Sequence, residues 1–239
     1  MPSSPTPSLA PIILAGGLGT RLRPVTGELP KVLAEVRGRP FITYLLDWIR
    51  GAGFARACIS IGYGAEAVMD VLGHQWRGLG IDYSREHERL GTGGGVRLAL
   101  SRIETEGVLV MNGDSAVDAP LTDFVRFALA GEGPALLAVK VADTARYGSL
   151  DIEDGVVRRF LEKGRTGEGW INAGVYYFPR DVVEALPEGA SSLETDLLQK
   201  AAGSLRAMRC DAPFLDIGTP EDFARAADAD WFDRLGGEA

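Results

Sequence analysis

Short apolar runs and helix-like apolar spacing alternate along the first half of the chain. Two continuous apolar runs, 12–15 and 108–111, are typical of strands buried on both faces of a sheet, and the segments 57–61 and 81–84 also read as strands. Three stretches between them repeat apolar residues every three or four positions, as amphipathic helices do: 41–49, 65–72 and 96–101. Strands that alternate with helices in this way predict a mostly parallel sheet with helices on both faces.

The pattern changes in the middle of the chain, where strand-like segments follow one another with little helix between them. These segments are 135–141, 149–152, 156–160 and 174–178. After them come two helical stretches, a strand and a closing helix: 181–186, 192–202, 205–210 and 219–229. Thr219 is the expected N-cap of the last helix, with Pro220 in its first turn. We therefore expect an α/β fold whose mostly parallel, doubly wound, Rossmann-like sheet carries a β-rich addition for a second substrate.

Composition limits the classes of partner. No repeat or linker divides the chain, so we expect one domain over residues 11–239 after a disordered tail at 1–10. The net charge of −8 disfavours nucleic acid, which needs a basic surface. The absence of a membrane-length apolar stretch and of a signal peptide predicts a cytoplasmic protein with no membrane partner. Cys58 and Cys210 are expected to be reduced thiols, and two histidines are too few for a histidine-based metal centre.

A glycine-rich, basic segment follows the first predicted strand. Gly16, Gly17 and Gly19 allow the backbone to turn tightly and to direct N–H groups at an anion. No Gly-Lys-Ser/Thr ends the segment, so it is not a Walker A loop, and Leu22 replaces the third glycine of a dinucleotide fingerprint. An ordinary turn with solvated arginines would account for the glycines, but it explains poorly why Arg21, Arg23 and Lys31 follow so closely.

Two other motifs stand where predicted strands end. Asp114 closes Asn112-Gly113-Asp114 after the run 108–111, and a carboxylate at the carboxyl end of a buried strand lies where such sheets bind ligands. Taken alone, Asp114 could equally cap the next element. The second motif, Gly91-Thr92-Gly93-Gly94-Gly95, could be only a flexible turn that opens the following helix.

The extended string GG-x-GTRL-x-P-x-T…PK resembles the signature of the sugar-1-phosphate nucleotidyltransferases. The matching residues are Gly16, Gly17, Gly19, Thr20, Arg21, Leu22, Pro24, Thr26, Pro30 and Lys31. Asn112-Gly113-Asp114 and Phe214-Leu215-Asp216-Ile217-Gly218-Thr219-Pro220 also resemble motifs of that family, and the resemblance extends from residue 11 to 230. It implies the nucleotide-diphospho-sugar transferase fold.

For the nucleotide, the resemblance implies a loop backbone that holds the triphosphate of an NTP. Arg21 would contact the β- and γ-phosphates, Lys31 would neutralise charge near the α-phosphate, and Asp114 with Asp216 would bind Mg²⁺. These four are the expected catalytic residues. The loop and base contacts would come from Leu14, Ala15, Gly16, Gly17, Gly19, Thr20, Glu88, Gly91, Thr92, Gly93 and Asn112. Cations and positioning are what phosphoryl chemistry needs most.

For the acceptor, a sugar 1-phosphate, the resemblance implies a second set of residues. They are Asn112, Gly148, Glu162, Lys163, Asn172 and Glu194. The usual proline after the lysine is Gly164 here, which leaves the shape of that loop open. Singly, Glu162 and Lys163 also read as a surface pair, Asn172 as a turn residue, and the segment around Glu194 as a helix start capped by Ser192.

Local strings such as Pro40-Phe41-Ile42 and Leu193-Glu194-Thr195-Asp196 resemble the heptose 1-phosphate guanylyltransferases of the family. GTP and D-glycero-D-manno-heptose 1-phosphate are therefore the expected substrates, with NDP-sugar and pyrophosphate as products. The alternative is a uridylyl- or thymidylyltransferase that acts on a hexose or N-acetylmuramate 1-phosphate. Whether two copies form a homodimer is left open.

Two other classes of protein compete with this interpretation. A glycosyltransferase would hold its metal through Asp-x-Asp, a spacing that Asp114-Ser115-Ala116 lacks. A non-catalytic regulatory subunit would be expected to lose the loop arginine, the Pro-Lys pair or a metal aspartate. This chain keeps all of them, which favours an enzyme.

Overall fold

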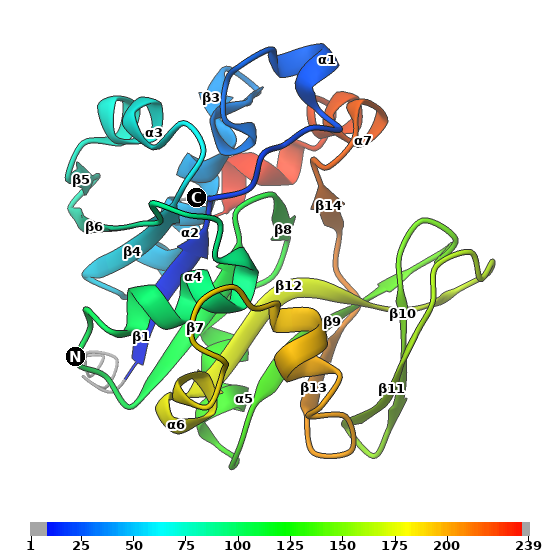
Figure 1. The fold of residues 1–239 in the computed structure, drawn as a ribbon. Helices are drawn as coiled ribbons and strands as arrows, with labels where there is room; N and C mark the ends of the chain where they lie inside the picture. Colours follow the sequence, from blue (N-terminus) through cyan, green and yellow to red (C-terminus); the bar gives the residue numbers. More distant parts are fainter. Residues whose placement is uncertain (1–8, 236–239) are drawn as a thin grey trace.

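The computed structural model describes residues 9–235 (Figure 1). Most of the predicted tail, residues 1–8, lies outside the described residues. The prediction was wrong at Leu9 and Ala10, which begin the first strand, β1 (Leu9–Leu14). They pair with Gly107 and Val108, and Leu9 is buried. The strand therefore starts before Pro11, because the neighbouring strand offers it backbone partners.

One half of the ten-stranded sheet is parallel, in the order β7-β1-β4-β6, with β5 antiparallel at the edge. The bounds are β4 (Arg56–Ile61), β5 (Gln75–Trp76), β6 (Leu79–Arg85) and β7 (Gly107–Asn112). Strands β1, β4, β6 and β7 overlap the four strands predicted from the sequence, and β1, β4 and β7 are mostly buried, as expected for parallel strands with helices on both faces. Strand β6 is more polar, with Asp82 exposed, and β5 was not predicted.

The other half of the sheet is mainly antiparallel. Its strands are β9 (Ala135–Val141), β10 (Ser149–Glu153), β11 (Val156–Leu161), β12 (Gly169–Pro179) and β13 (Arg206–Cys210). Strand β12 runs antiparallel to both β7 and β9, and β13 runs parallel to β9. Since β10 pairs with β11 and also with β12, these five strands close into a ring. The sheet is thus mixed, and the predicted β-rich addition is continuous with it.

Helices cover both faces of the sheet. The face that carries Ile13 packs against α2 (Phe41–Gly51), α3 (Ala65–Leu72) and α5 (Leu121–Leu129). The face that carries Ile12 packs against α4 (Gly91–Leu100), α6 (Arg180–Glu184) and the π-helical turn η2 (Leu193–Leu198). Successive strand residues point to opposite faces, so one strand contributes to two separate cores.

Several elements differ from the prediction. Helix α5 was not predicted, although Leu121, Phe124 and Ala128 lie on one buried face. Helix α4 starts at Gly91, so the glycine motif is helical.

The remaining elements are α1 (Arg23–Thr26), η1 (Lys31–Leu33), β2 (Glu35–Val36), β3 (Arg39–Pro40), β8 (Ser115–Val117), β14 (Phe214–Asp216), α7 (Pro220–Ala226) and η3 (Asp230–Arg234).

Three smaller predictions can be checked in the structure. The Thr219 side chain caps α7 as expected, by accepting a hydrogen bond from the Asp222 N–H. Cys58 and Cys210 are free thiols, and burial raises the pKa of Cys58 to about 11. None of the helices in the described part of the chain is both long and apolar enough to cross a membrane.

Candidate functional site

The glycine-rich segment and Asn112-Gly113-Asp114 meet at the carboxyl ends of β1 and β7. Leu14 is paired with Asn112, and the Gly113 N–H donates to the Leu14 carbonyl over 2.9 Å. A Cβ at position 113 would lie 2.4 Å from that carbonyl oxygen, so only glycine fits there. In Figure 1 this edge is the upper end of the molecule, where α1, β8 and β14 also lie.

A two-stranded sheet brings the two predicted metal ligands together. Strands β8 and β14 are antiparallel, and Asp216 is paired with Ser115. The Ile217 N–H also donates to the Asp114 carbonyl over 2.9 Å. Asp114 and Asp216 are far apart in the sequence, but this pairing places them side by side at the end of β7.

Lys31 lies between the two carboxylates. Its Nζ donates to Asp114 Oδ2 over 2.6 Å and lies 3.8 Å from Asp216 Oδ1. The lysine is carried by η1, and a Cβ at Gly19, where φ is +59°, would lie 3.0 Å from the lysine Cβ. The glycine segment therefore packs directly on the lysine stem.

Burial and the neighbouring charge of Asp114 raise the pKa of Asp216. Lys31 and the Gly218 N–H, which donates to Asp216 Oδ1, counteract this in part. A second positive charge at this place would offset the repulsion between the carboxylates.

The two aspartates fit a divalent metal. Both carboxylates converge on one cationic atom, Lys31 Nζ, so the site already accommodates positive charge. Mg²⁺ typically takes one or two protein carboxylates and completes its shell with water and substrate phosphates. Within residues 9–235, no group of three or more His, Cys, Asp or Glu side chains could hold a metal ion by itself. The site thus suits an ion that a substrate helps to bind.

The rest of the glycine segment is open. Gly17 is exposed, and a Cβ there would meet nothing within 4 Å. Thr20 and Arg21 are exposed, and Arg21 has no hydrogen bond or ion pair with any residue that the structure describes. Leu22, in contrast, is fully buried and anchors the segment.

A carboxylate that sequence reasoning missed lies next to this segment. Ser60 Oγ donates to Glu86 Oε1 over 3.3 Å, and the Leu90 N–H donates to Oε2 over 3.1 Å. A Cβ added at Gly16 would lie 3.0 Å from Oε1, and one at Gly95 2.8 Å. The predicted Glu88 is exposed instead. The rule that selected Asp114 points to this region, because Glu86 directly follows the parallel strand β6, but it does not distinguish Glu86 from Glu88.

The glycines of α4 allow a close contact with the segment before η2. Cβ atoms at Gly91 and Gly93 would lie 2.5 Å from the Ser191 carbonyl oxygen and 2.6 Å from its Oγ. The Gly93 N–H donates to that carbonyl, and Thr92 Oγ1 accepts from the Leu193 N–H over 2.9 Å. The interpretation as a flexible turn was wrong, because these glycines form a packed helix start.

Three of the expected acceptor residues, Gly148, Glu162 and Asn172, lie at the amino-terminal end of β10. Ser149 is paired with Leu161 of β11 and with Ile171 of β12. The same registers place Gly148, Glu162 and Asn172 beside one another. Glu162 and Lys163 are exposed and have no hydrogen bond or ion pair within the described part of the chain.

Asn172 and Asn112 are linked through the bulge in β12. Asn172 Oδ1 accepts from the Gly174 N–H over 3.0 Å, and its Nδ2 donates to Tyr176 Oη over 2.9 Å. A Cβ at Gly174, where φ is +76°, would lie 2.7 Å from Asn112 Nδ2. These contacts bring the acceptor side up to the end of β7.

Tyr176 connects this cluster to two acids. Burial raises the pKa of Tyr176, the hydrogen bond with Asn172 lowers it, and the charges of Glu194 and Asp114 raise it further. Glu194 belongs to η2 and is exposed, yet its charge raises the pKa of the same phenol as the charge of Asp114 does. Three of the predicted acceptor residues, Asn112, Asn172 and Glu194, thus act on this one tyrosine.

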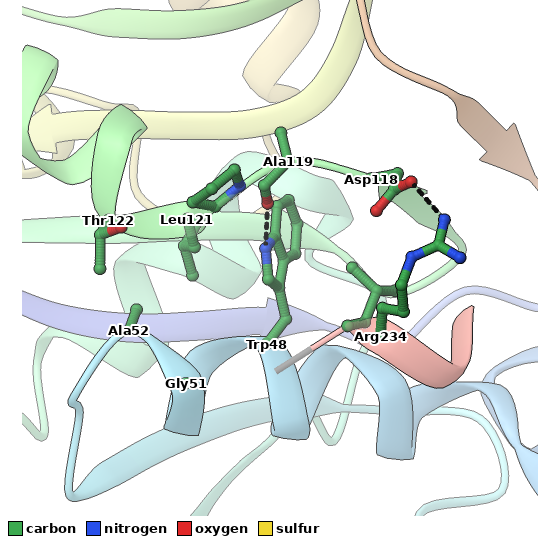
Figure 2. Close-up of a pocket in the computed structure, with 10 residues that line it drawn as sticks. Trp48, Gly51, Ala52, Asp118, Ala119, Leu121, Thr122 and Arg234 are labelled. Atoms are coloured by element: carbon green, nitrogen blue, oxygen red, sulfur yellow. Dashed lines mark hydrogen bonds and ion pairs between the residues drawn. The ribbon is translucent and has the colours of Figure 1, made fainter. Parts of the chain in front are cut away.

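A cavity of about 220 Å³ lies outside this site, between α2, α5 and η3 (Figure 2). The Trp48 Nε1–H donates to the Ala119 carbonyl over 2.7 Å, and Arg234 forms an ion pair with Asp118 at 3.1 Å. None of the predicted site residues lines it. Its charged side chains, Asp118 and Arg234, are paired with each other.

Known proteins resemble the chain over most of its length. D-glycero-α-D-manno-heptose 1-phosphate guanylyltransferase of Aneurinibacillus thermoaerophilus is 36% identical over 90% of this chain and 95% of its own. Mannose-1-phosphate guanylyltransferase of Mycobacterium tuberculosis is 35% identical, over 90% of this chain and 63% of its own. The crystal structure of HddC from Yersinia pseudotuberculosis complexed with GMP-PN has a TM-score of 0.84 and 37% identity, and covers 92% of this chain and 98% of its own.

The nucleotidyl transferase family model matches residues 10–231. That range includes the glycine segment, Lys31, Asp114, Asp216 and the acceptor side. With the site geometry described above, this match shows that the chain belongs to the nucleotidyl transferase family.

Proposed function

We propose that the protein transfers the guanylyl group of GTP to a sugar 1-phosphate, with D-glycero-D-manno-heptose 1-phosphate as the preferred acceptor, and releases pyrophosphate. The observation that carries the proposal is the convergence of Asp114 and Asp216 on Lys31, directly beside the glycine segment. The relative from Aneurinibacillus thermoaerophilus, whose name states this activity, matches over nearly the whole chain.

In the proposed reaction an oxygen of the acceptor phosphate attacks the α-phosphorus of GTP in line. The new bond joins that oxygen to the α-phosphorus, and the bond to the bridging oxygen of pyrophosphate breaks. The acceptor phosphate is an anion at neutral pH, so no base has to remove a proton. Catalysis then consists of positioning and charge stabilisation.

The chain's own cations supply much of that stabilisation. Lys31 is held at the metal end of the site and offsets charge on the α-phosphoryl group. Arg21, which is exposed and has no ion pair within residues 9–235, takes the β- and γ-phosphates. Backbone N–H groups of the glycine segment bind phosphate oxygens. Asp114 and Asp216 would hold Mg²⁺, which when bound neutralises phosphate charge.

Glu86 is the proposed reader of the base. A carboxylate can accept hydrogen bonds from N1–H and the 2-amino group of guanine together, which no uracil, thymine or adenine edge offers. Ser60 and Leu90 hold this carboxylate from the other side. Glu88, Gly91 and Thr92 stay exposed around the start of α4, where they would border the nucleoside.

The acceptor residues are proposed to bind the sugar phosphate. Asn172 and Asn112 lie next to the metal end, so they suit hydroxyls near the reacting phosphate. Glu162 and Lys163 have no partner within residues 9–235, which leaves the carboxylate for sugar hydroxyls and the ammonium for the phosphate.

A hexose acceptor is the second candidate. The relative from Mycobacterium tuberculosis is named for mannose 1-phosphate and is almost as similar to the chain as the heptose enzyme. The chain spans 63% of that relative's length but 95% of the heptose enzyme's, and this difference favours the heptose.

The test is pyrophosphate release from a matrix of substrates. The purified protein is incubated with Mg²⁺, one of GTP, ITP, ATP, UTP or dTTP, and one of several heptose or hexose 1-phosphates in each anomeric form. We expect release with GTP and a heptose 1-phosphate, and weaker release with ITP, which lacks the 2-amino group. Preference for a pyrimidine nucleotide would contradict the role of Glu86, and no release from any pair would contradict the function.

A further inference from the structure

Residues Gly16 to Pro30, called here the arginine segment, are anchored in the protein body by the buried Leu22 and Pro30. The seven residues between these two are all exposed or half-buried. The segment's own hydrogen bonds are local, such as those from the Val25 N–H to the Leu22 carbonyl and from the Gly27 N–H to the Arg23 carbonyl. Its outer side is exposed, with Val25 and Leu29 50% and 42% accessible to solvent. In Figure 1 it forms the top of the molecule around α1. Such a segment needs further anchors to hold Arg21 in one place.

The turn between β4 and α3 supplies these anchors. Tyr63 Oη donates to Glu28 Oε2 over 2.6 Å, and the Arg23 guanidinium lies 5.4 Å from the centre of the Tyr63 ring. Next to the tyrosine, a Cβ at Gly64 would lie 2.4 Å from Pro30 Cγ, so the turn also packs on the end of the segment. One tyrosine thus contacts the arginine segment both through its hydroxyl and through its ring.

Tyr63 is not a core residue. It is half-buried and belongs to neither hydrophobic cluster, whereas Ala65, the first residue of α3, is fully buried in the core. The hydrogen bond to Glu28 raises the pKa of Tyr63, so the phenol keeps its proton and stays a donor at neutral pH. The contacts therefore contribute more to the placement of the arginine segment than to the stability of the fold.

We propose that Tyr63 is a positioning residue for the nucleotidyl transfer, which holds the arginine segment through Glu28 and Arg23 so that Arg21 meets the triphosphate. The proposal rests on the proposed function for the role of Arg21. It adds that Tyr63 touches no substrate and acts through the segment. Arg21 itself has no partner among the described residues, so its position depends on how the segment is held.

The first test does not depend on activity. Hydrogen–deuterium exchange is measured on the ligand-free protein for wild type, Tyr63→Phe and Tyr63→Ala. The Phe variant loses only the hydroxyl, and the Ala variant also loses the ring under Arg23. We expect the amides of residues 22–29 to exchange about 2- to 10-fold faster in Tyr63→Phe, as one net hydrogen bond predicts, and faster again in Tyr63→Ala. Unchanged exchange of this segment would overturn the proposal.

The matched control is Tyr83→Phe. Tyr83 also donates its hydroxyl to a single acceptor, the Gly73 carbonyl, but that contact lies outside the arginine segment. This variant should leave the exchange of residues 22–29 unchanged. Equal acceleration in Tyr83→Phe would show a general loosening and would also overturn the proposal.

The second test is a double-mutant cycle on kcat/KM for GTP. Tyr63→Phe should lower it by about 2- to 10-fold with the KM for the sugar phosphate unchanged. In an Arg21→Ala background the same substitution should have no further effect, because there is no arginine left to place. If Tyr63 had a purely structural role, Tyr63→Phe would lower kcat/KM equally in both backgrounds. A full effect in the Arg21→Ala background would therefore contradict action through Arg21.

Glu28 provides a rescue experiment. Glu28→Ala should reproduce the effects of Tyr63→Phe, and Glu28→Gln, whose amide oxygen can still accept from Tyr63, should restore most of the wild-type value. If wild type releases no pyrophosphate with any substrate pair, the proposed function fails, while the exchange experiment still decides whether Tyr63 holds the segment.

Discussion

The proposed nucleotide side and the proposed acceptor side of the site differ in how firmly most of their charged side chains are held, with the exposed Arg21 as the exception on the nucleotide side. Lys31 is 11% exposed and bonded to Asp114, Asp216 accepts from the Gly218 N–H, and Glu86 is held by Ser60 and Leu90. On the acceptor side, the side chains of Glu162, Lys163 and Glu194 are exposed and have no hydrogen bond or ion pair within residues 9–235.

The difference follows from the two halves of the sheet. The nucleotide side stands where parallel strands end together, and close contacts at Gly113 and Gly218 leave its groups little freedom. The acceptor side is built on hairpins of the antiparallel half, whose tips extend into solvent (Figure 1). Pre-organised charges lower a reaction barrier, whereas free side chains can adapt to a polyhydroxylated ligand. Substitutions should therefore affect the two sides in different ways.

The largest loss of activity is expected for Asp114→Asn, on the nucleotide side. Loss of one carboxylate charge should lower kcat by about 10³-fold, because Asp114 is one of the two proposed carboxylate ligands of Mg²⁺. Pyrophosphate release at saturating substrate and Mg²⁺ is the measurement. Asp118→Asn is the control: Asp118 follows β8 and pairs with Arg234, and its loss should leave kcat unchanged. A near-normal rate for Asp114→Asn would mean that this side is not the reaction centre.

Lys31→Ala should lower kcat by about 10²-fold, since one charge-stabilising contact is lost. Alanine keeps the Cβ on which Gly19 packs, so the loss reports the ammonium group rather than a collapse of the segment. The rate is compared with that of Lys200→Ala, an exposed lysine paired with Asp196. Equal rates for the two variants would refute the assigned role.

Asp222 of α7 joins the acceptor side to the helix that follows Asp216. It is 3% exposed and bonds Arg146, just before Gly148, as well as Arg225 on its own helix. Asp222→Asn should lower the free energy of unfolding by about 2 kcal/mol at pH 7, because it leaves a buried charge network incomplete. Urea titrations measure this, with Asp123→Asn as the control. Asp123 is half-exposed and pairs with the exposed Arg126, so its loss should change the free energy of unfolding by less than about 0.5 kcal/mol.

The same variant gives a pH dependence. Burial by itself raises the pKa of Asp222, but hydrogen bonds from Arg225, Thr219 and Arg146 outweigh it and hold the pKa below its ordinary value. A lowered pKa stabilises the folded protein above the unfolded-state value of about 3.9 and loses that contribution as the pH falls through the folded-state value. The difference between wild type and Asp222→Asn should therefore be constant at neutral pH and shrink below about pH 4. A difference that grows toward acid would contradict the sign.

The smallest effect is expected on the acceptor side. Lys163→Ala should raise the KM for the sugar 1-phosphate about tenfold, with kcat and the KM for GTP almost unchanged, because an exposed ammonium supplies binding but little positioning. Initial rates with each substrate varied in turn give the three values. The midpoint of thermal unfolding of Lys163→Ala should equal that of the wild-type protein. A large loss of kcat would show that this side is as pre-organised as the other.

Local chemistry was enough to predict some of the site. Asp114 could be selected because it follows a continuous apolar run, and neighbouring residues are enough to predict both the strand and the place where it ends. The choice between Glu86 and Glu88 could not be made in this way, since both follow β6. Only contacts from Ser60 and Leu90 distinguish the carboxylate that lies beside the glycine segment.

Helix α4 shows the opposite case, in which local preference misleads. Glycine disfavours helices, and the run at 91–95 therefore reads as a turn. In the folded chain the missing side chains allow the helix start to contact residues 189–191, and a Cβ at Gly94 would lie 2.4 Å from the Gly189 carbonyl. The contact outweighs the intrinsic cost, which no inspection of the segment alone reveals.

The sequence by itself determined the parallel strands, most helices, the glycine segment and the acid at the end of β7, because each depends on residues within a few positions of one another. The tertiary structure decided which acids share one cation and which glutamate enters the site. Asp216 reaches Asp114 only through the pairing of β14 with β8, and Tyr63 reaches Glu28 only because the turn after β4 packs on Pro30. Such contacts join segments that are remote in the chain, so their geometry exists only in the folded protein.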